Sequence, residues 1–247
     1  GGVGMRIVLP EPLAQRARAV AAGEVAPAPV EPAATVVLIR PAGEAVEVYL
    51  QHRNRALAFA GGVHAFPGGR VDPADAQTLR DDMTGPSAAD WAARFGSASA
   101  DEAAAHVAAA VRELVEETGV RLDPSGLVGW SRWVTPRFER RRFDAWFFVA
   151  ASPAGQEPQV ATSESHEGVW MRPDDALAAL GSGTLAMLPP TWWTLREIAE
   201  RGSMAGVLGH PPPMRRYTVG WTRSDGEVVM ALPGDPAYPG DDPREGA

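Results

Sequence analysis

Residues 112–120 read Arg-Glu-Leu-Val-Glu-Glu-Thr-Gly-Val, so three glutamates, one arginine and one glycine stand close together. Residues three and four positions apart share one face of an α-helix, which predicts that Glu113, Glu116 and Glu117 project from the same side. Like charges this close repel one another. A hard divalent cation, which takes carboxylate oxygens as ligands, is the simplest way to offset them.

The neighbouring residues favour this interpretation over an ordinary solvated acidic face. Aliphatic residues between the acids give the helix a buried side, and Arg112 can pair with Glu116 four residues later. Gly119 is typical of the residue after a helix, because glycine tolerates the left-handed conformation there. Upstream, residues 66–69 read Phe-Pro-Gly-Gly and predict a sharp bend that brings backbone groups near a ligand.

Residues 112–120 match the second half of the Nudix box, G-x5-E-x7-R-E-U-x-E-E-x-G-U, in which U is aliphatic. The first half is stretched. Gly69 stands for the opening glycine, Asp75 replaces the first glutamate, and the spacer expands to residues 76–111. The chain resembles the Nudix hydrolases, and within them the coenzyme A diphosphatase-like branch with an insertion inside the box.

The resemblance implies an α/β fold, the Nudix α/β/α sandwich with a mixed sheet, over residues 33–202. We expect an N-terminal extension or linker at 1–32 and an insertion at about 76–99. Residues 203–247 would form a C-terminal hairpin extension and an irregular tail.

Hydrophobic periodicity and turn residues predict the elements of this fold. We expect strands at 34–40, 45–51, 63–66, 130–135, 142–150, 169–171, 216–223 and 227–232, and helices at 13–22, 90–94, 100–118, 173–180 and 190–201. Ser99 and Glu102 have the spacing of a capping box at the start of the longest helix.

The resemblance implies Mg²⁺ or Mn²⁺ as cofactor, held by Glu113, Glu116, Glu117 and the carbonyl of Gly69. Such an ion would neutralise a diphosphate and lower the pKa of a bound water. We count Glu116 and Arg112 among the catalytic residues. The arginine either orients a glutamate or touches a phosphate. The missing glutamate of the box could be replaced by Asp75, Asp72 or Glu102, or by none of them.

A general base must deprotonate the attacking water. Residues 162–170 form the candidate loop, with Glu164 as first choice and Glu167 as second, and a plain polar surface loop as the alternative.

Substrate contacts are expected from Arg53, Arg137 and Arg140. Arg53 lies in a segment similar to the motif upstream of the box in coenzyme A-cleaving relatives, although Ala58 replaces the second arginine of that motif. Arginine suits phosphate through paired hydrogen bonds, but a solvated loop arginine is an equal alternative. The basic cluster at 137–142 could contact an anionic group or form a solvated hairpin tip.

These residues predict a metal-dependent hydrolase that cleaves the phosphoanhydride of a nucleoside diphosphate linked to a further group. Coenzyme A or an acyl-coenzyme A is the leading substrate. An ADP-ribose or dinucleotide pyrophosphatase is an alternative, and so is a weakly active nucleotide-binding regulatory module.

The composition narrows the partners and the compartment. The 247 residues carry a formal net charge of −8 and no cysteine, which excludes disulfides and zinc–thiolate sites. The negative charge disfavours nucleic acid and anionic membranes as partners. We find no apolar run of membrane-spanning length and no secretory signal pattern, so we expect a cytoplasmic protein and leave a homodimer open.

Overall fold

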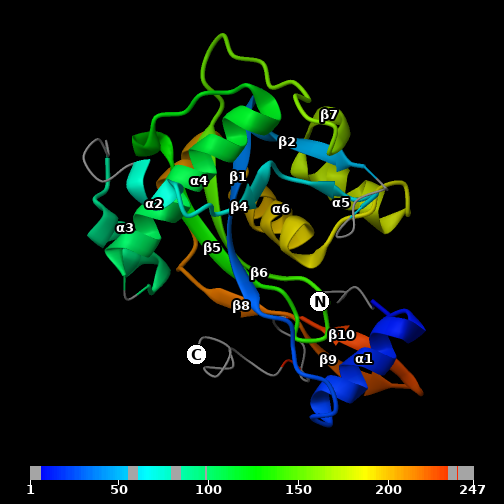
Figure 1. Cartoon of the computed structure of the whole chain (residues 1–247). Helices are drawn as coiled ribbons and strands as arrows, with labels where there is room; N and C mark the ends of the chain where they lie inside the picture. The colour runs from blue at the N-terminus through cyan, green and yellow to red at the C-terminus, as the bar shows by residue number, and fades with distance from the viewer. Residues whose placement is uncertain (1–6, 55–60, 79–84, 98, 233–237, 239–247) are drawn as a thin grey trace. The chain divides into compact units, whose positions relative to one another are not determined.

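The computed structural model describes residues 7–54, 61–78, 85–97, 99–232 and 238, which form two compact units (Figure 1). The larger unit spans 32–131 and 145–215, and the smaller one spans 1–31, 132–144 and 216–247. Ala58 and most of the tail expected after Leu232 lie outside the described residues.

A mixed sheet forms the centre of the larger unit, with strand order β3-β2-β1-β6-β5. Two further strands pair antiparallel with it, β4 with β1 and β7 with β2. The strands are β1 (Val30–Ala42), β2 (Ala45–Arg53), β3 (His64–Ala65), β4 (Gly68–Arg70), β5 (Val128–Val134), β6 (Arg142–Ala151) and β7 (Ser165–Met171).

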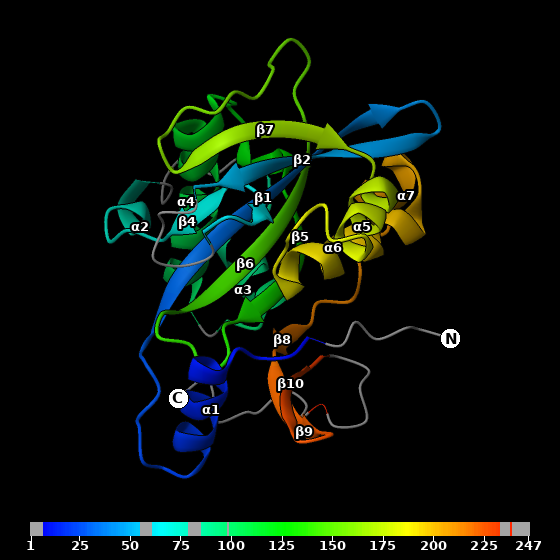
Figure 2. The same ribbon diagram turned by 90° about the vertical axis from the view of Figure 1, so that its right-hand side faces the viewer.

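Helices cover both faces of this sheet. The helices of the unit are α2 (Asp75–Thr78), α3 (Ala88–Phe95), α4 (Ala100–Thr118), α5 (Pro173–Gly181), α6 (Pro189–Arg201) and α7 (Met204–Gly209), with a 3₁₀ turn at Pro124–Gly126. Figures 1 and 2 show α3 and α4 on one side of the sheet and α5 and α6 on the other. The predicted α/β/α sandwich is confirmed.

Helix α4 begins and ends where the sequence predicts. Ser99 accepts a hydrogen bond from the Glu102 amide at 3.2 Å, and Gly119 ends the helix with a φ of 75°. The reciprocal half of the expected capping box is different, because the Glu102 carboxylate accepts a hydrogen bond from the Ser97 hydroxyl. A complete capping box stands instead at the start of α3, between Ser87 and Asp90.

The insertion inside the box contributes to the hydrophobic core. Trp91 and Phe95 of α3 are almost fully buried, and the Phe95 ring stacks on Trp146 of β6 with centroids 4.2 Å apart. On the opposite face of the same indole, the His106 ring of α4 stacks at 4.0 Å. The insertion therefore holds α4 against the sheet.

Two expectations about the elements were wrong, and some elements were not expected. β7 begins at Ser165, earlier than expected, because Ser165 and Glu167 pair with the end of β2. The expected strand 216–223 is two strands that pair with different partners. Helix α7 was not expected, and its short sequence Met-Ala-Gly-Val-Leu-Gly shows no amphipathic period that would predict it.

The smaller unit contains α1 (Glu11–Ala21), β8 (Arg216–Thr218), β9 (Gly220–Ser224) and β10 (Glu227–Ala231). β8 runs parallel to residues 132–134 of β5, while β9 and β10 form the predicted hairpin. Its turn places both Asp225 and Gly226 at positive φ, as a two-residue hairpin requires. Its core gathers Leu9, Ala14, Ala17, Phe138 and Val228. No helix among the described residues is long and apolar enough to cross a membrane.

Candidate active site

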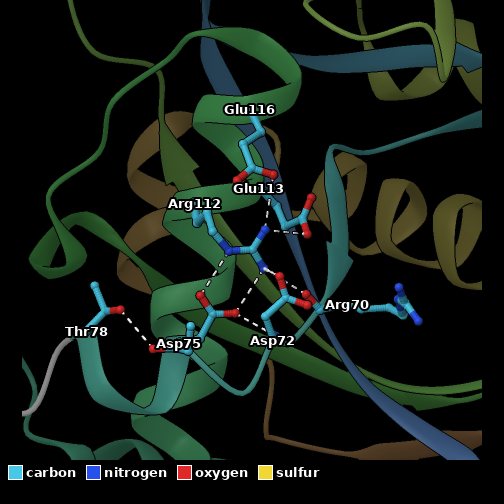
Figure 3. A network of polar contacts seen from close by, with 8 residues as sticks. Arg70, Asp72, Asp75, Thr78, Arg112, Glu113 and Glu116 are labelled. Atoms are coloured by element: carbon cyan, nitrogen blue, oxygen red, sulfur yellow. Dashed lines mark hydrogen bonds and ion pairs between the residues drawn. The ribbon is translucent and has the colours of Figure 1, made fainter.

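Arg112 is the centre of the acidic cluster (Figure 3). Its Nε and Nη2 donate to the two carboxylate oxygens of Asp75, each at 2.9 Å. Its Nη1 donates to Glu113 at 2.8 Å and to Glu116 at 3.1 Å, and its Nη2 also donates to the carbonyl of Arg70. The hydrogen bonds that Arg112 donates to Asp75 raise the pKa of Arg112 above its usual value. Arg112 therefore contacts both Glu113 and Glu116, which is what the first of its two expected roles requires.

Asp75 fills the position opposite Arg112. It is 3% exposed and accepts a further hydrogen bond from the Asp72 amide at 2.7 Å. The exposed Asp72 carboxylate is a more distant neighbour of the guanidinium, at 3.7 Å. Glu102 lies at the exposed start of α4, bonded to Ser97. Asp75 is thus the residue that pairs with Arg112, although it is one methylene shorter than the glutamate of the motif.

Glu113 lies directly against the glycine segment of β4. An added Cβ at Gly69 would overlap the Glu113 carboxylate, so only glycine allows this approach. Burial raises the pKa of Glu113, while the hydrogen bond from Arg112 lowers it. The side chain is 16% exposed.

Glu117 is the most buried of the three glutamates, at 5% exposure. One of its oxygens accepts a hydrogen bond from the Gly68 amide at 2.9 Å. Burial raises the pKa of Glu117 to about 7, against the opposing effects of the Gly68 amide and Arg53. The charges of Glu113 and Glu164 raise the pKa further. The charges of Arg53, Glu113 and Glu164 therefore all act on Glu117.

Glu116 differs from its two neighbours on the helix. Its side chain is 54% exposed and bonds Arg112 one turn earlier. The structure therefore brings Glu113 and Glu117 against the glycine segment, and Glu116 beside the arginine.

The carboxylates fit a hard divalent cation by their chemistry. Glu117 is buried and Glu113 is half-buried, and burial raises the pKa of both carboxyl groups. Oxygen donors of this kind are what Mg²⁺ and Mn²⁺ prefer. Across the described ranges, no three acidic, histidine or cysteine side chains already converge at metal-binding spacing. The metal-ligand roles of Gly69, Glu113, Glu116 and Glu117 stay predictions.

The end of β2 carries Arg53 beside Glu164. The Arg53 guanidinium lies 3.8 Å from the Glu164 carboxylate, and the Asn54 amide donates to the Glu164 carbonyl at 2.7 Å. The Nε of Arg53 is buried and has no hydrogen-bond partner within the part of the chain that the structure describes. The charges of Arg53 and Glu164 both act on the pKa of Glu117, as the prediction of a common site requires.

Glu167 points elsewhere. It lies opposite His52 in the pairing of β2 with β7, whereas Gly168 lies opposite Gln51. Side chains alternate between the two faces of a sheet, so Glu167 and Gln51 occupy opposite faces. Since the Gln51 amide reaches Glu117, Glu167 is on the other side, where its charge acts on His64. The expected loop around Glu167 is a strand, and the geometry favours Glu164 as the base.

The predicted substrate residues Arg137 and Arg140 lie between β5 and β6. This segment belongs to the smaller unit, whereas the glutamates belong to the larger one. A substrate contact from either arginine stays a prediction.

Gln51 was not among the residues predicted from the sequence. This side chain is 3% exposed, and its amide donates to the carbonyl of Glu117 at 3.3 Å. The sequence offered only a weak signal, a glutamine that directly follows Val48, Tyr49 and Leu50 in a predicted strand.

Comparisons with known proteins agree with this geometry. A family model described as the NUDIX domain matches residues 29–189. A human protein, acyl-coenzyme A diphosphatase NUDT19, is 30% identical over 124 residues, or 45% of this chain and 32% of the human protein. The chain therefore spans about a third of the length of the curated relative that it matches.

Solved structures are similar in fold. A NUDIX hydrolase from Alicyclobacillus acidocaldarius matches with a TM-score of 0.65 and 24% identity, over 75% of this chain and 98% of its own. A MutT protein from Bacillus halodurans matches with a TM-score of 0.47 and 14% identity, over 84% and 100% of the two chains.

Proposed function

The chain belongs to the NUDIX family, and we propose on that basis that it is a metal-dependent hydrolase of phosphoanhydride bonds. Its substrate would be a small nucleoside diphosphate linked to a further group, which water splits into a nucleoside monophosphate and the phosphorylated group. The observation that supports this most is the burial of Glu113 and Glu117 against Gly68 and Gly69. Carboxylates that are buried or half-buried in this way suit a divalent cation, and the cation in turn suits a diphosphate.

Each residue of the cluster has a task in this reaction. Asp75 fixes Arg112, Arg112 holds Glu113 and Glu116, and the Gly68 amide holds Glu117. Mg²⁺ or Mn²⁺, when bound by the glutamates and the Gly69 carbonyl, would offset the diphosphate charge and favour deprotonation of water.

Glu164 would take the proton of the attacking water on a carboxylate oxygen. A bond then forms from the water oxygen to phosphorus, and the bridging bond from phosphorus to oxygen breaks. Arg53 lies beside Glu164, and its buried Nε lacks a partner among the described residues. That donor suits a phosphate oxygen of the substrate.

Coenzyme A or an acyl-coenzyme A is the substrate that we propose. Support comes from the name of the human relative, acyl-coenzyme A diphosphatase, and from the upstream segment that contains Arg53.

The test is hydrolysis by the purified protein with Mg²⁺ or Mn²⁺ across a panel of diphosphates. The panel holds coenzyme A, an acyl-coenzyme A, ADP-ribose, NADH and diadenosine polyphosphates, with the products identified. We expect the coenzyme A compounds to be cleaved, and Glu117→Gln to lower kcat by at least about a hundredfold, as for loss of an essential electrostatic group. Glu200→Gln, an exposed glutamate of α6, is the matched control and should keep wild-type activity.

Two results would contradict the proposal at different levels. Cleavage of ADP-ribose or a dinucleotide without cleavage of coenzyme A would reject the substrate and keep the reaction. Turnover that Glu117→Gln leaves unchanged would reject the catalytic cluster and favour a nucleotide-binding module.

A further inference from the structure

We propose that Gln51 is a positioning residue that sets where Glu164 stands relative to Glu117. The inference rests on the proposed function, in which Glu117 binds the metal and Glu164 is the base. In the proposed reaction, Gln51 touches neither the substrate nor the reacting atoms. It acts through the backbone of Glu117 and through Ser165, the residue that follows Glu164.

The Gln51 amide connects two elements from within the core. Its Nε2 donates to the carbonyl of Glu117 at the end of α4, at 3.3 Å. Its Oε1 accepts from the hydroxyl of Ser165, the first residue of β7, at 3.5 Å. Gln51 is 3% exposed and Ser165 is 6% exposed, so water does not compete for these bonds. The two ends of the Gln51 amide therefore contact two different elements, the end of α4 and the start of β7.

The same carbonyl also anchors the chain that leads to Glu164. A helix leaves its last carbonyls without partners inside the helix, and the Glu117 carbonyl accepts a second hydrogen bond from the Ala161 amide at 3.0 Å. Inside the turn, the backbone amide of Asn54 donates to the Glu164 carbonyl at 2.7 Å. The turn at 161–165 is therefore held between the end of α4 and the end of β2.

The strand pairing is irregular next to this turn. β7 lies alongside β2 in both views (Figures 1 and 2), but the register of the pair shifts between His52 and Arg53. The shift lies between the pairing of His52 with Glu167 and that of Arg53 with Ser165, so the ladder is irregular one pair before Glu164. Gln51 and Ser165 supply the side-chain connection across this irregular point.

Energetics favour a geometric role for the buried amide. Burying an amide costs free energy unless it is hydrogen-bonded, and an apolar side chain would fill the same space without that cost. A satisfied polar group in a core specifies one arrangement of the elements around it. Here the elements are the helix of the metal ligands and the turn of the base.

The test compares Gln51→Met, which keeps the length of the side chain and removes both hydrogen bonds, with Gln156→Met. Gln156 is a matched control, since its amide also binds backbone near the end of α4, at the amide and carbonyl of Arg121. We expect Gln51→Met to lower kcat about tenfold to a hundredfold, the scale of a small misplacement of a catalytic group. The KM for substrate and the half-saturating Mg²⁺ concentration should stay within about twofold, and the control should change none of them.

Two further measurements separate positioning from a general loss of structure. Ser165→Ala should lower kcat in the same way, and the double variant should lose no more than the worse single variant, since both break one connection. Hydrogen exchange should speed up in peptides covering 161–165 for Gln51→Met, while peptides of β6 keep wild-type exchange.

The outcomes distinguish this inference from the proposed function. Suppose that the wild type cleaves a diphosphate and that Glu164→Gln loses this turnover, as proposed. If Gln51→Met then keeps wild-type kcat and wild-type hydrogen exchange, Gln51 has no positioning role. A uniform rise in exchange across the larger unit, with KM and kcat both impaired, would also reject the inference. If the wild type cleaves no diphosphate, the proposed function fails and the inference fails with it.

Discussion

Arg112 and Asp75 form a two-point ion pair, in which Nε and Nη2 of the arginine each meet one carboxylate oxygen at 2.9 Å. The two residues are 37 positions apart, so the pair closes a loop that contains the whole insertion. Arg112 thus connects the acidic helix to Asp75 and to the Arg70 carbonyl after the glycines. Asp75 stands where the motif has a glutamate.

Asp75→Asn should destabilise the protein by about 2–3 kcal/mol, because it weakens the charged hydrogen bonds between Arg112 and a carboxylate that is 3% exposed. Urea unfolding at neutral pH measures the change. Asp72→Asn is the control, since its carboxylate is 57% exposed and 3.7 Å from Arg112, and it should cost under about 1 kcal/mol. Equal losses in both variants would show that the two-point geometry has no special weight.

Much of this site was predictable because its signals are local. The spacing of Glu113, Glu116 and Glu117 needs only the helical period, and Gly119 marks the helix end through its own backbone freedom. For the same reason α4 has the bounds that the sequence predicts. The placement of Glu113 against Gly69 also agrees with the motif.

The remainder depends on tertiary contacts that no local pattern encodes. Ser165 and Glu167 lie in a polar segment that is typical of a loop, yet pairing with β2 makes it a strand and turns Glu167 away from Glu117. Asp75 could be recognised as the partner of Arg112 only once the insertion was folded. Gln51 stands in an apolar strand and becomes informative only through its contact with the Glu117 carbonyl.

The insertion should be necessary for the stability of the larger unit. Phe95→Ala removes a ring that is 3% exposed and stacked on Trp146, so we expect a loss of about 3–5 kcal/mol in the free energy of unfolding. Gln77→Ala, an exposed change in α2, should stay within about 0.5 kcal/mol. A Phe95→Ala variant as stable as wild type would mean that the insertion packs loosely.

Glu197 should make the free energy of unfolding fall as pH rises above about 4.5. Burial raises its pKa from 4.5, while hydrogen bonds from Trp130 and Trp193 and the charges of Arg201 and Arg196 lower it. The folded state therefore binds the proton more tightly than the unfolded state. This stabilisation is full below about pH 4.5 and is lost as pH rises through the folded value.

Urea unfolding across a pH series tests this in wild type and in Glu197→Gln. The variant should show a less negative slope of unfolding free energy between about pH 4.5 and 7, because its amide does not titrate. Glu200→Gln on the same helix is the control and should keep the wild-type slope. A wild-type slope in Glu197→Gln would assign the pH dependence to other carboxyl groups.

Gly69→Ala should weaken metal binding without unfolding the protein, because the new methyl group would displace the Glu113 carboxylate beside it. Thermal unfolding measures this without reference to activity. A cation that binds only the folded state stabilises it by about 2.7 kcal/mol at one hundred times its Kd, so Mg²⁺ or Mn²⁺ should raise the wild-type Tm.

We expect that rise to shrink in Gly69→Ala and to shrink further in Glu113→Gln, as each change removes or misplaces a carboxylate donor. Gly181→Ala is the control, because an added Cβ there meets no atom within 4 Å, and it should keep the full response. The same Tm rise in all four proteins would show that the cation binds elsewhere, since only a site built on Glu113 and the Gly69 backbone distinguishes them.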